Sequence, residues 1–350
     1  MTLYAGPAAG DYFADHADDV FGFPLGMMSG GDLCVPDISG ELEGMEDPGS
    51  MGGEGQSKAG GSAGRVTGSF DESYDEGCET DEPSSAISDD FKDKLREFDG
   101  MAATIRFADG AIELEAAGDA GLGSTVPLGG STADVVESLP SDSGAVVALG
   151  FKEGWFGDIV DYVAPYAGED ADDLMSELSD MTGLDLPADA ETLSGDSAAL
   201  VLGGDFDPDA FFSSDDGSDI PVAVKIKGDP DKIEKVLDKL RDMAGPQANV
   251  LESDKDGDVI VVGPNADYRD EVLGDGGLGD NDVFKDVVRE SDKAQGLVFV
   301  DVDVFEDAIE ESMGDSDKEF FENFKQLSGI GAVAWVEDGV SHTVLRAATN

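Results

Sequence analysis

The apolar residues of this chain follow two periods, which predict alternating strands and helices over its C-terminal two thirds. Apolar runs predict strands at 144–151, 197–202, 220–227, 249–253, 259–262 and 297–302. Apolar residues spaced by three and four predict helices at 155–163, 170–181, 230–243, 266–273, 281–290, 303–313 and 317–327. Gly183 follows the second helix, and Asp229 with Pro230 opens the third, in agreement with capping preferences.

A helix followed by a hairpin is predicted nearer the N-terminus. Phe91, Leu95 and Phe98 share one face of a helix. The turn Asp109-Gly110 then joins two strand-like runs within 101–116.

The end of the chain has a closely similar unit. Phe320, Phe324 and Leu327 match the three apolar positions of the first helix, and Asp338-Gly339 matches the turn. Every matched position differs by 229 residues, as Gly110 and Gly339 do. A helix face and a turn that agree at one offset predict an internal repeat.

Weaker similarities, such as Gly6-Pro7 with Gly263-Pro264, extend this repeat upstream. On this interpretation the chain begins within a first module, and we expect that residues precede Met1 in the native protein. The fold class expected is α+β (mixed α/β), a duplicated module of antiparallel hairpins with packed helices whose first copy is incomplete. The expected parts are 1–43 (partial first module), 44–85 (flexible Gly/Ser-rich and acidic segment), 86–117 (helix and hairpin ending the first module), 118–135 (linker) and 136–350 (complete second module).

The net charge of the chain excludes some classes of binding partner. The 79 acidic residues against 21 basic ones give a net charge of −58. Such a chain repels nucleic-acid phosphates and anionic lipid headgroups, so neither nucleic acid nor an anionic membrane surface is expected as a partner. Three interpretations of the acidity stay open: solubility in high salt, life outside the cell, and binding of a basic protein partner or, weakly, of divalent cations.

Cysteine content and hydropathy add little. Cys34 and Cys78 do not form a disulfide framework, and both a single bridge and two free thiols stay open. No run of about 18 apolar residues predicts a transmembrane helix. The N-terminal sequence lacks the basic region and apolar core of a signal peptide.

Two glycine motifs have weak contexts. Gly274 to Gly279 fits G-x-G-x-x-G, but a helix rather than a strand precedes it, so we interpret it as a loop between helices. Gly60 to Gly64 fits the G-x-S-x-G of hydrolases within low-complexity sequence that lacks a strand–turn–helix pattern. His16 and His342 are the only histidines for a catalytic base, and His342 is expected on an edge strand.

The acidic and aromatic clusters also have structural interpretations. Asp254, Asp256 and Asp258 resemble part of a calcium loop, but Asn265 stands where the last glutamate is needed, which favours a β-turn. Residues 205–219 form a second acidic cluster, interpreted as a solvated loop with six members: Asp205, Asp207, Asp209, Asp215, Asp216 and Asp219. Three aromatic residues, interpreted as core, are Trp155, Phe156 and Trp335. No catalytic or cofactor-binding residue is therefore assigned, no cofactor is expected, and metal binding stays open.

A family resemblance follows from three motifs. They are Leu139-Pro140 with Asp142 and the run Val146 to Phe151, the sequence VDVD at 300–303, and the final hairpin ending in Leu345-Arg346. These resemble a family of actinobacterial cell-envelope proteins of unknown function, which usually have one N-terminal transmembrane segment. The resemblance implies a non-enzymatic extracytoplasmic binding or accessory module, membrane-tethered in its full-length form, although this sequence lacks the tether. The alternatives are a cytoplasmic acidic protein of a salt-adapted organism and an uncharacterised hydrolase or metal-dependent enzyme.

Overall fold

One antiparallel sheet with helices on both of its faces makes up the described part of the chain. The computed structural model describes residues 1–6, 8, 9, 11, 96, 98–119, 128–167, 170–207, 214, 217–274, 276–306 and 325–350. Within them, 11 strands form a single sheet, and all its strand pairs are antiparallel. The predicted mixture of helices with antiparallel hairpins is confirmed.

The strands, in chain order, are β1 (Thr2–Ala5), β2 (Met101–Ala108), β3 (Ala111–Asp119), β4 (Ser143–Gly150), β5 (Ser197–Gly203), β6 (Val222–Lys227), β7 (Ser253–Asp256), β8 (Val259–Val262), β9 (Gly296–Asp301), β10 (Leu327–Glu337) and β11 (Val340–Thr349). The α-helices are α5 (Ala133–Glu137), α6 (Trp155–Ala167), α7 (Ala171–Thr182), α8 (Ala188–Ser194), α10 (Pro230–Ala244), α11 (Ala266–Leu273) and α12 (Asp282–Val287). The 3-10 helices are η2 (Gly245–Leu251), η3 (Leu278–Asp280) and η4 (Ser291–Lys293).

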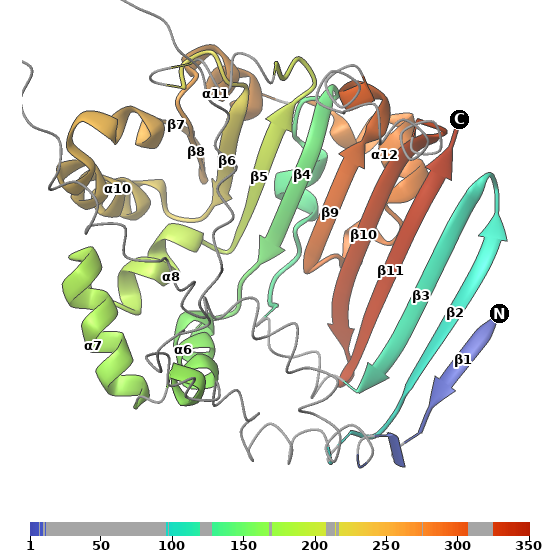
Figure 1. Ribbon diagram of the computed structural model, residues 1–350. Helices are drawn as coiled ribbons and strands as arrows, with labels where there is room; N and C mark the ends of the chain where they lie inside the picture. Colours follow the sequence, from blue (N-terminus) through green and yellow to red (C-terminus); the bar gives the residue numbers. More distant parts are fainter. Residues whose placement is uncertain are drawn as a thin grey trace, which may run out of the picture. The chain divides into compact units, whose positions relative to one another are not determined.

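The order of strands across the sheet differs from their order in the chain. It runs β1-β2-β3-β11-β10-β9-β4-β5-β6-β8-β7 (Figure 1). The last two strands of the chain therefore lie between β3 and β9, so that strands from both expected modules share one sheet. β9 is the central strand of the 11, and β4 lies next to it, between β9 and β5.

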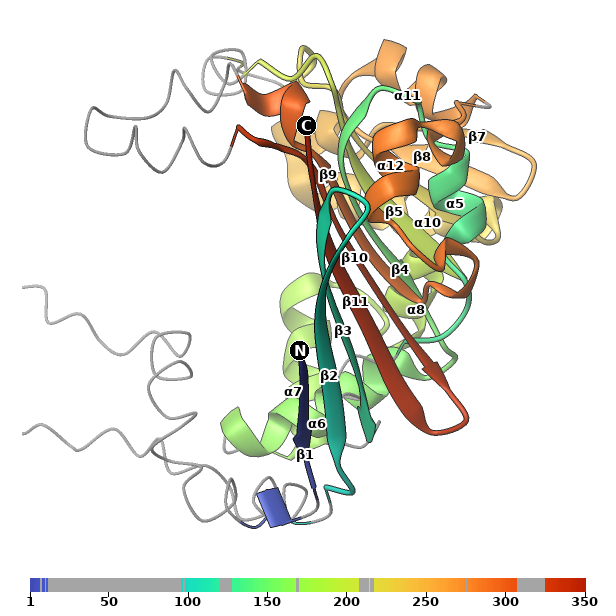
Figure 2. The ribbon, with the colours of Figure 1, turned by 90° about the vertical axis from the view of Figure 1, so that its right-hand side faces the viewer.

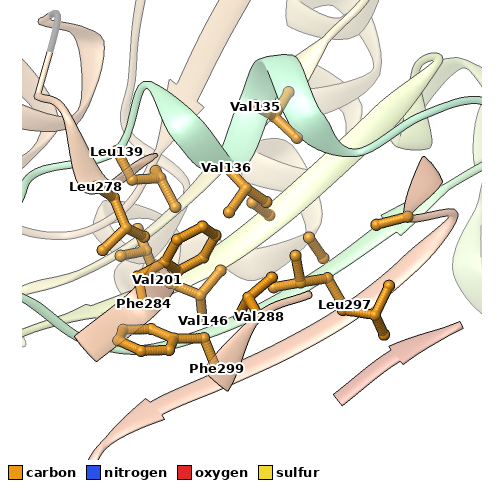
Figure 3. Close-up of a cluster of buried hydrophobic side chains, with 14 of the residues drawn as sticks. Val135, Val136, Leu139, Val146, Val201, Leu278, Phe284, Val288, Leu297 and Phe299 are labelled. Carbon is orange, nitrogen blue, oxygen red and sulfur yellow. The ribbon is translucent and has the colours of Figure 1, made fainter. Parts of the chain in front are cut away.

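The main core lies between one face of the sheet and helices α5, α11 and α12. Alternate residues of the central strands point to this face, and they are almost fully buried. Phe284 of α12 meets Phe299 of β9 edge to face, with ring centroids 5.2 Å apart. Figure 3 shows these two rings beside residues from α5, η3, β4 and β5. We call this the helix-covered face.

A smaller core lies on the opposite face, at the other end of the sheet. Ile226 and Ile260 pack there against Ile233 and Leu237 of α10, with Leu193 of α8 beside them. In Figure 2, α6 and α7 lie to one side of the sheet, whereas α5, α11 and α12 lie to the other. Each face is thus covered by helices over only part of its width, within the described residues.

Two buried cations attach helix ends to the helix-covered face. Lys225 of β6 is 3% exposed, and its amino group donates to the carbonyls of Ser138 and Val272, at the ends of α5 and α11. Arg346 of β11 is equally buried and donates to the carbonyl of Asp286 in the last turn of α12. Carbonyls at helix C-termini lack partners within the helix and carry partial negative charge, so cations stabilise them.

Glu113 of β3 provides the counter-charge for Arg346. Its carboxylate accepts from Arg346 at 2.8 Å and from Arg106 of β2 at 2.6 Å. Burial acts to raise the pKa of Glu113, but the hydrogen bonds from the two arginines outweigh it and hold this pKa below its ordinary range. The three residues join β2, β3 and β11 to α12.

The two hairpins that suggested a repeat have the same geometry. Their turn residues Asp109-Gly110 and Asp338-Gly339 all have positive φ, as a two-residue type I′ turn requires. Ala108 pairs with Ala111 across the first turn, and Glu337 with Val340 across the second, at the same offset of 229 residues. The predicted hairpins are confirmed. The larger module duplication stays a prediction, and Phe91, Leu95, Phe320 and Phe324 lie outside the described residues.

Several element boundaries differ from the prediction. Residues 249–253, predicted as a strand, lie mostly in η2, because the chain continues from α10 into a 3-10 turn after Gly245, whose φ is +55°. The helix predicted at 281–290 ends at Val287. α5 and α8 were not predicted, since each is too short to show a helical period. The interval 118–135 was expected to be a linker, but its last residues belong to α5, and Val135 is buried there.

Replacing Glu113 tests the buried charge network. We expect Glu113→Gln to lower the free energy of unfolding by ~3 kcal/mol at neutral pH, because it removes the carboxylate that neutralises the buried guanidinium of Arg346 at 2.8 Å. Because the pKa of Glu113 is lowered, its contribution is present above the ordinary glutamate pKa and is lost as pH falls through the lowered value.

Urea denaturation between pH 3 and pH 7 measures this loss. Glu115→Gln, which removes a more exposed partner of Arg106, is the matched control and should cost less than about 1 kcal/mol. Equal losses for both variants would contradict a special role for the buried pair.

Candidate binding surface

An unbroken row of apolar side chains crosses the face opposite the helix-covered one. Cross-strand partners always point to the same face, so the row can be followed from the strand pairing. From β2 to β8 it runs through Ile105, Leu114, Leu345, Ala332, Val298, Val147, Leu200, Val224 and Val262. Leu3 of β1 points to this face as well, because it pairs with Ala103, two residues from Ile105.

We call this surface the uncharged face. It consists of the row from β2 to β6, of the residues two or four positions away from each row member on the same strand, and of Leu3 and Ala5 on β1. None of these positions holds Asp, Glu, Lys or Arg, and only Ser and Thr among them are polar. In a chain with 79 acidic residues, an uncharged area across nine neighbouring strands is unlike the rest of the protein.

Much of the uncharged face is open within the described residues. Its exposed large apolar side chains range from 39% at Val298 to 79% at Phe107, whereas Ile226, which packs against α10, is 6% exposed. The exposed members are Leu3, Met101, Phe107, Ile112, Val147, Leu200, Val298 and Leu345. Nine strands spaced by about 4.8 Å span roughly 40 Å. Exposed apolar patches of this extent mark interaction sites on proteins.

The opposite side of the first hairpin is polar. Arg106, Glu113 and Glu115 point there, toward the helix-covered face. The equivalent residues of the last hairpin, at the offset of 229, are Trp335, His342 and Val344. Charge therefore occurs on one side of this hairpin only. A hairpin wetted on both sides is expected to carry charge on both, so the pattern favours a contact on the uncharged face.

A second candidate is an acidic group around Tyr268 of α11. Burial and the carboxylates of Glu271, Asp142 and Asp205 raise the pKa of the Tyr268 hydroxyl above its ordinary value. Tyr268 is 6% exposed, and the nearby hydroxyl of Ser143 only partly opposes this rise of its pKa. The pKa of Glu271 is raised by burial and then by Asp142 and Asp205. Within the described part of the chain, no group of His, Cys, Asp or Glu side chains is arranged to hold a metal ion.

The calcium-like aspartates lie on the β7–β8 hairpin, which turns at Gly257. Asp254 accepts a hydrogen bond from the buried guanidinium of Arg269 at 2.7 Å, so this carboxylate joins α11 to β7. The turn interpretation is confirmed. Of the second acidic cluster, Asp205, Asp207 and Asp219 are described, whereas 209, 215 and 216 lie outside the described residues.

The G-x-G-x-x-G motif begins directly after α11 and ends within η3, so its described residues connect two helical elements, as expected. A Cβ on Gly276 would lie 2.3 Å from the carbonyl oxygen of Leu139, so this glycine permits close packing against the residues that follow α5. The G-x-S-x-G motif at 60–64, both cysteines and His16 lie outside the described residues.

Trp335 is a core residue, as predicted. It is 7% exposed, its ring stacks on His342 at 4.8 Å, and the Lys293 amino group lies over it at 5.5 Å from the centroid. The expectation that His342 lies on an edge strand is wrong, because β3 pairs with β11 on its outer side. Trp155 donates to the hydroxyl of Ser194 and packs between Phe151 and Phe156.

The uncharged face was missed at the level of sequence, although a signal was present. The run from Met101 to Phe107 alternates apolar residues with Ala, Thr and Arg, and the run from Ala111 to Gly118 alternates apolar residues with Glu and Ala. This period of two shows which side of the hairpin is apolar. It does not show that nine strands join their apolar sides into one surface.

Glu271 gives a pH-dependent test of the acidic group. Because its pKa is raised in the folded state, the ionised form is disfavoured there, and stability is lost as pH rises through the raised value. Glu271→Gln should therefore raise the melting temperature at pH 7 by one or two degrees and leave it unchanged near pH 4. Asp270→Asn, at an exposed carboxylate of the same helix, is the control in thermal denaturation. A gain that persists at pH 4 would contradict this assignment.

Comparisons with protein-family models, with curated proteins and with solved structures find no match to this chain. None of the helices in the described residues is long and apolar enough to cross a membrane.

Proposed function

We propose that this protein is a non-enzymatic binding or accessory module of the cell envelope, and that its uncharged face is the surface on which it meets a protein partner. One observation carries the proposal: nine neighbouring strands present a charge-free face in a chain with a net charge of −58. The partner surface is expected to be apolar and uncharged, because an isolated charge placed against this face would lose hydration without gaining a counter-ion.

The size of the surface supports a protein partner. Eight of the nine strands have between six and 11 residues, so each of these extends over at least about 20 Å, and nine neighbouring strands are roughly 40 Å wide. A surface of this extent is comparable with the ~800 Å² that each partner buries in a standard interface. The period of two along each strand suits face-to-face packing of another sheet, at about 10 Å.

The placement in the envelope rests on the family resemblance. Its motifs lie on, or directly beside, β4, β9 and β11, which are inner strands of the sheet. The strong negative charge suits an exported protein, since it opposes aggregation and adhesion to anionic surfaces.

Accessibility of the face is the first requirement. The neutral dye Nile red should increase its fluorescence with the wild-type chain, and Phe107→Asp and Leu345→Asp should each reduce this increase at least about twofold. Met181→Asp replaces a residue that is 72% exposed on α7, outside the face, and should leave it unchanged. No dye response would mean that the face is covered within the chain itself.

Attachment in cells tests the function. The wild-type chain, expressed in its native host, should sediment with the envelope fraction. Phe107→Asp should shift most of it to the soluble fraction, while Met181→Asp should not. Phe107 is 79% exposed, so an Asp there costs little stability, and a denaturation curve checks this. A wild-type chain found only in the soluble fraction would overturn the proposal.

A further inference from the structure

β1 holds the same place on the first hairpin as β9 holds on the last. Leu3 of β1 pairs with Ala103, and Val298 of β9 pairs with Ala332. Ala103 and Ala332 are equivalent at the offset of 229 residues. Leu3 is thus the counterpart of Val298, and both side chains belong to the uncharged face.

The outer edges of these two strands differ in one respect. On β9, Val298 pairs with Val147, so β4 covers the outer edge. β1 is the last strand of the sheet, and within the described residues no strand lies beyond it. The edge of β1 that corresponds to the β4-covered edge of β9 therefore has no neighbouring strand within the described residues.

The hydrogen bonds between β1 and β2 show which main-chain groups of β1 point away from β2. Met1 donates to the carbonyl of Ile105 at 2.6 Å, and Ile105 donates back to Met1 at 2.8 Å. Hydrogen-bonded and non-hydrogen-bonded pairs alternate along an antiparallel ladder. Leu3 therefore bonds inward to β2, whereas the main-chain groups of Thr2 and Tyr4 point outward.

The two edges of the sheet also differ in charge. β7, at the far edge, has the sequence Ser-Asp-Lys-Asp, and charged residues of this kind protect edge strands against pairing. β1 has the sequence Thr-Leu-Tyr-Ala, with no charged side chain and no proline. In this acidic chain, β1 and β2 contain no acidic residue, and the one charged side chain on these two strands is that of Arg106.

We propose that β1 is a self-association strand, which pairs antiparallel with β1 of a second copy of this chain about a two-fold axis at Leu3. Thr2 then bonds Tyr4 of the other copy, and the reverse, giving about four main-chain hydrogen bonds. The two Leu3 side chains meet, and the uncharged faces of both copies become continuous. A strand that extends the sheet beyond β1 needs apolar residues on the uncharged face and polar residues on the other face. β1 has this pattern itself, with Leu3 on the uncharged face and Thr2 and Tyr4 on the other.

The chain already contains a contact of this kind. β3 and β11 are equivalent strands, and they pair antiparallel with Glu115 opposite Val344. These two residues are themselves equivalent at the offset of 229, so the hairpins are related by a local two-fold axis. Like isologous interfaces, this pairing brings the same edge of two copies together.

Net charge opposes the contact, so salt must favour it. Two chains of −58 repel each other, and the Debye length falls from about 10 Å at 0.1 M salt to about 3 Å at 1 M. Sedimentation equilibrium on the full chain should show dimers whose dissociation constant falls at least about tenfold between these salt concentrations. A monomer at both concentrations overturns the proposal.

A proline at position 4 tests whether dimers form through the main chain of β1 or through another surface. Tyr4→Pro removes an outward N–H and no bond to β2, which edge strands tolerate. It should weaken dimerisation at least about tenfold, because both copies lose a hydrogen bond. Tyr4→Val keeps the N–H and should dimerise as the wild type does. A dimer that Tyr4→Pro leaves intact contradicts β1 pairing.

Hydrogen exchange identifies the pairing itself. The amide of Tyr4 should become protected as protein concentration rises, while that of Leu3 is protected at every concentration. Protection of Tyr4 that does not depend on concentration would mean that β1 is paired within one chain. The self-association of β1 does not rest on the envelope function. Phe107→Asp leaves the β1 edge unchanged, so it should lose envelope attachment and still dimerise when both are measured.

Discussion

Buried cations on the helix-covered face determine where the helices lie. Lys225 and Arg346 project from the sheet among apolar side chains, and each must find acceptors there, because an unpaired buried charge is costly. They find them at the C-terminal ends of α5, α11 and α12, where carbonyls lack helical partners. Residues that are rare in this acidic chain thus hold three helices in place, and the apolar core fills the space between them.

This arrangement leaves the two faces of the sheet with different roles. On one face, helices pack against the strands from β8 to β11. On β2 and β3 the same face carries the charged network of Glu113 with Arg106 and Arg346. On the other face, α10 and α8 pack against β6 and β8 within the described residues. Its apolar row continues past them without a charge, which solvent alone would not favour. The binding role that we propose for this face rests on that pattern.

The paired hairpins explain how so wide a sheet forms from similar parts. Each hairpin has the same turn and the same register, and the edge of one continues the edge of the other. Antiparallel pairing of equivalent strands requires no new geometry, because the twist and the pleat of both are alike. The open edge of β1 then follows from the same plan, since the equivalent edge of β9 is covered by β4.

The sequence by itself determined the fold class, most strands and helices, and both hairpin turns. These depend on local signals, such as the period of apolar residues, the caps at Asp170 and Asp229, and turns with positive φ at Asp-Gly. It did not determine α5 or the end of η2, which are short and held by contacts with distant residues. Only the tertiary structure decided that β11 lies between β3 and β10, which removes His342 from the edge. It also decided that apolar residues from nine strands form one surface. Strand order depends on long-range packing, and a period of two records the side to which a residue points but not its neighbours in the sheet.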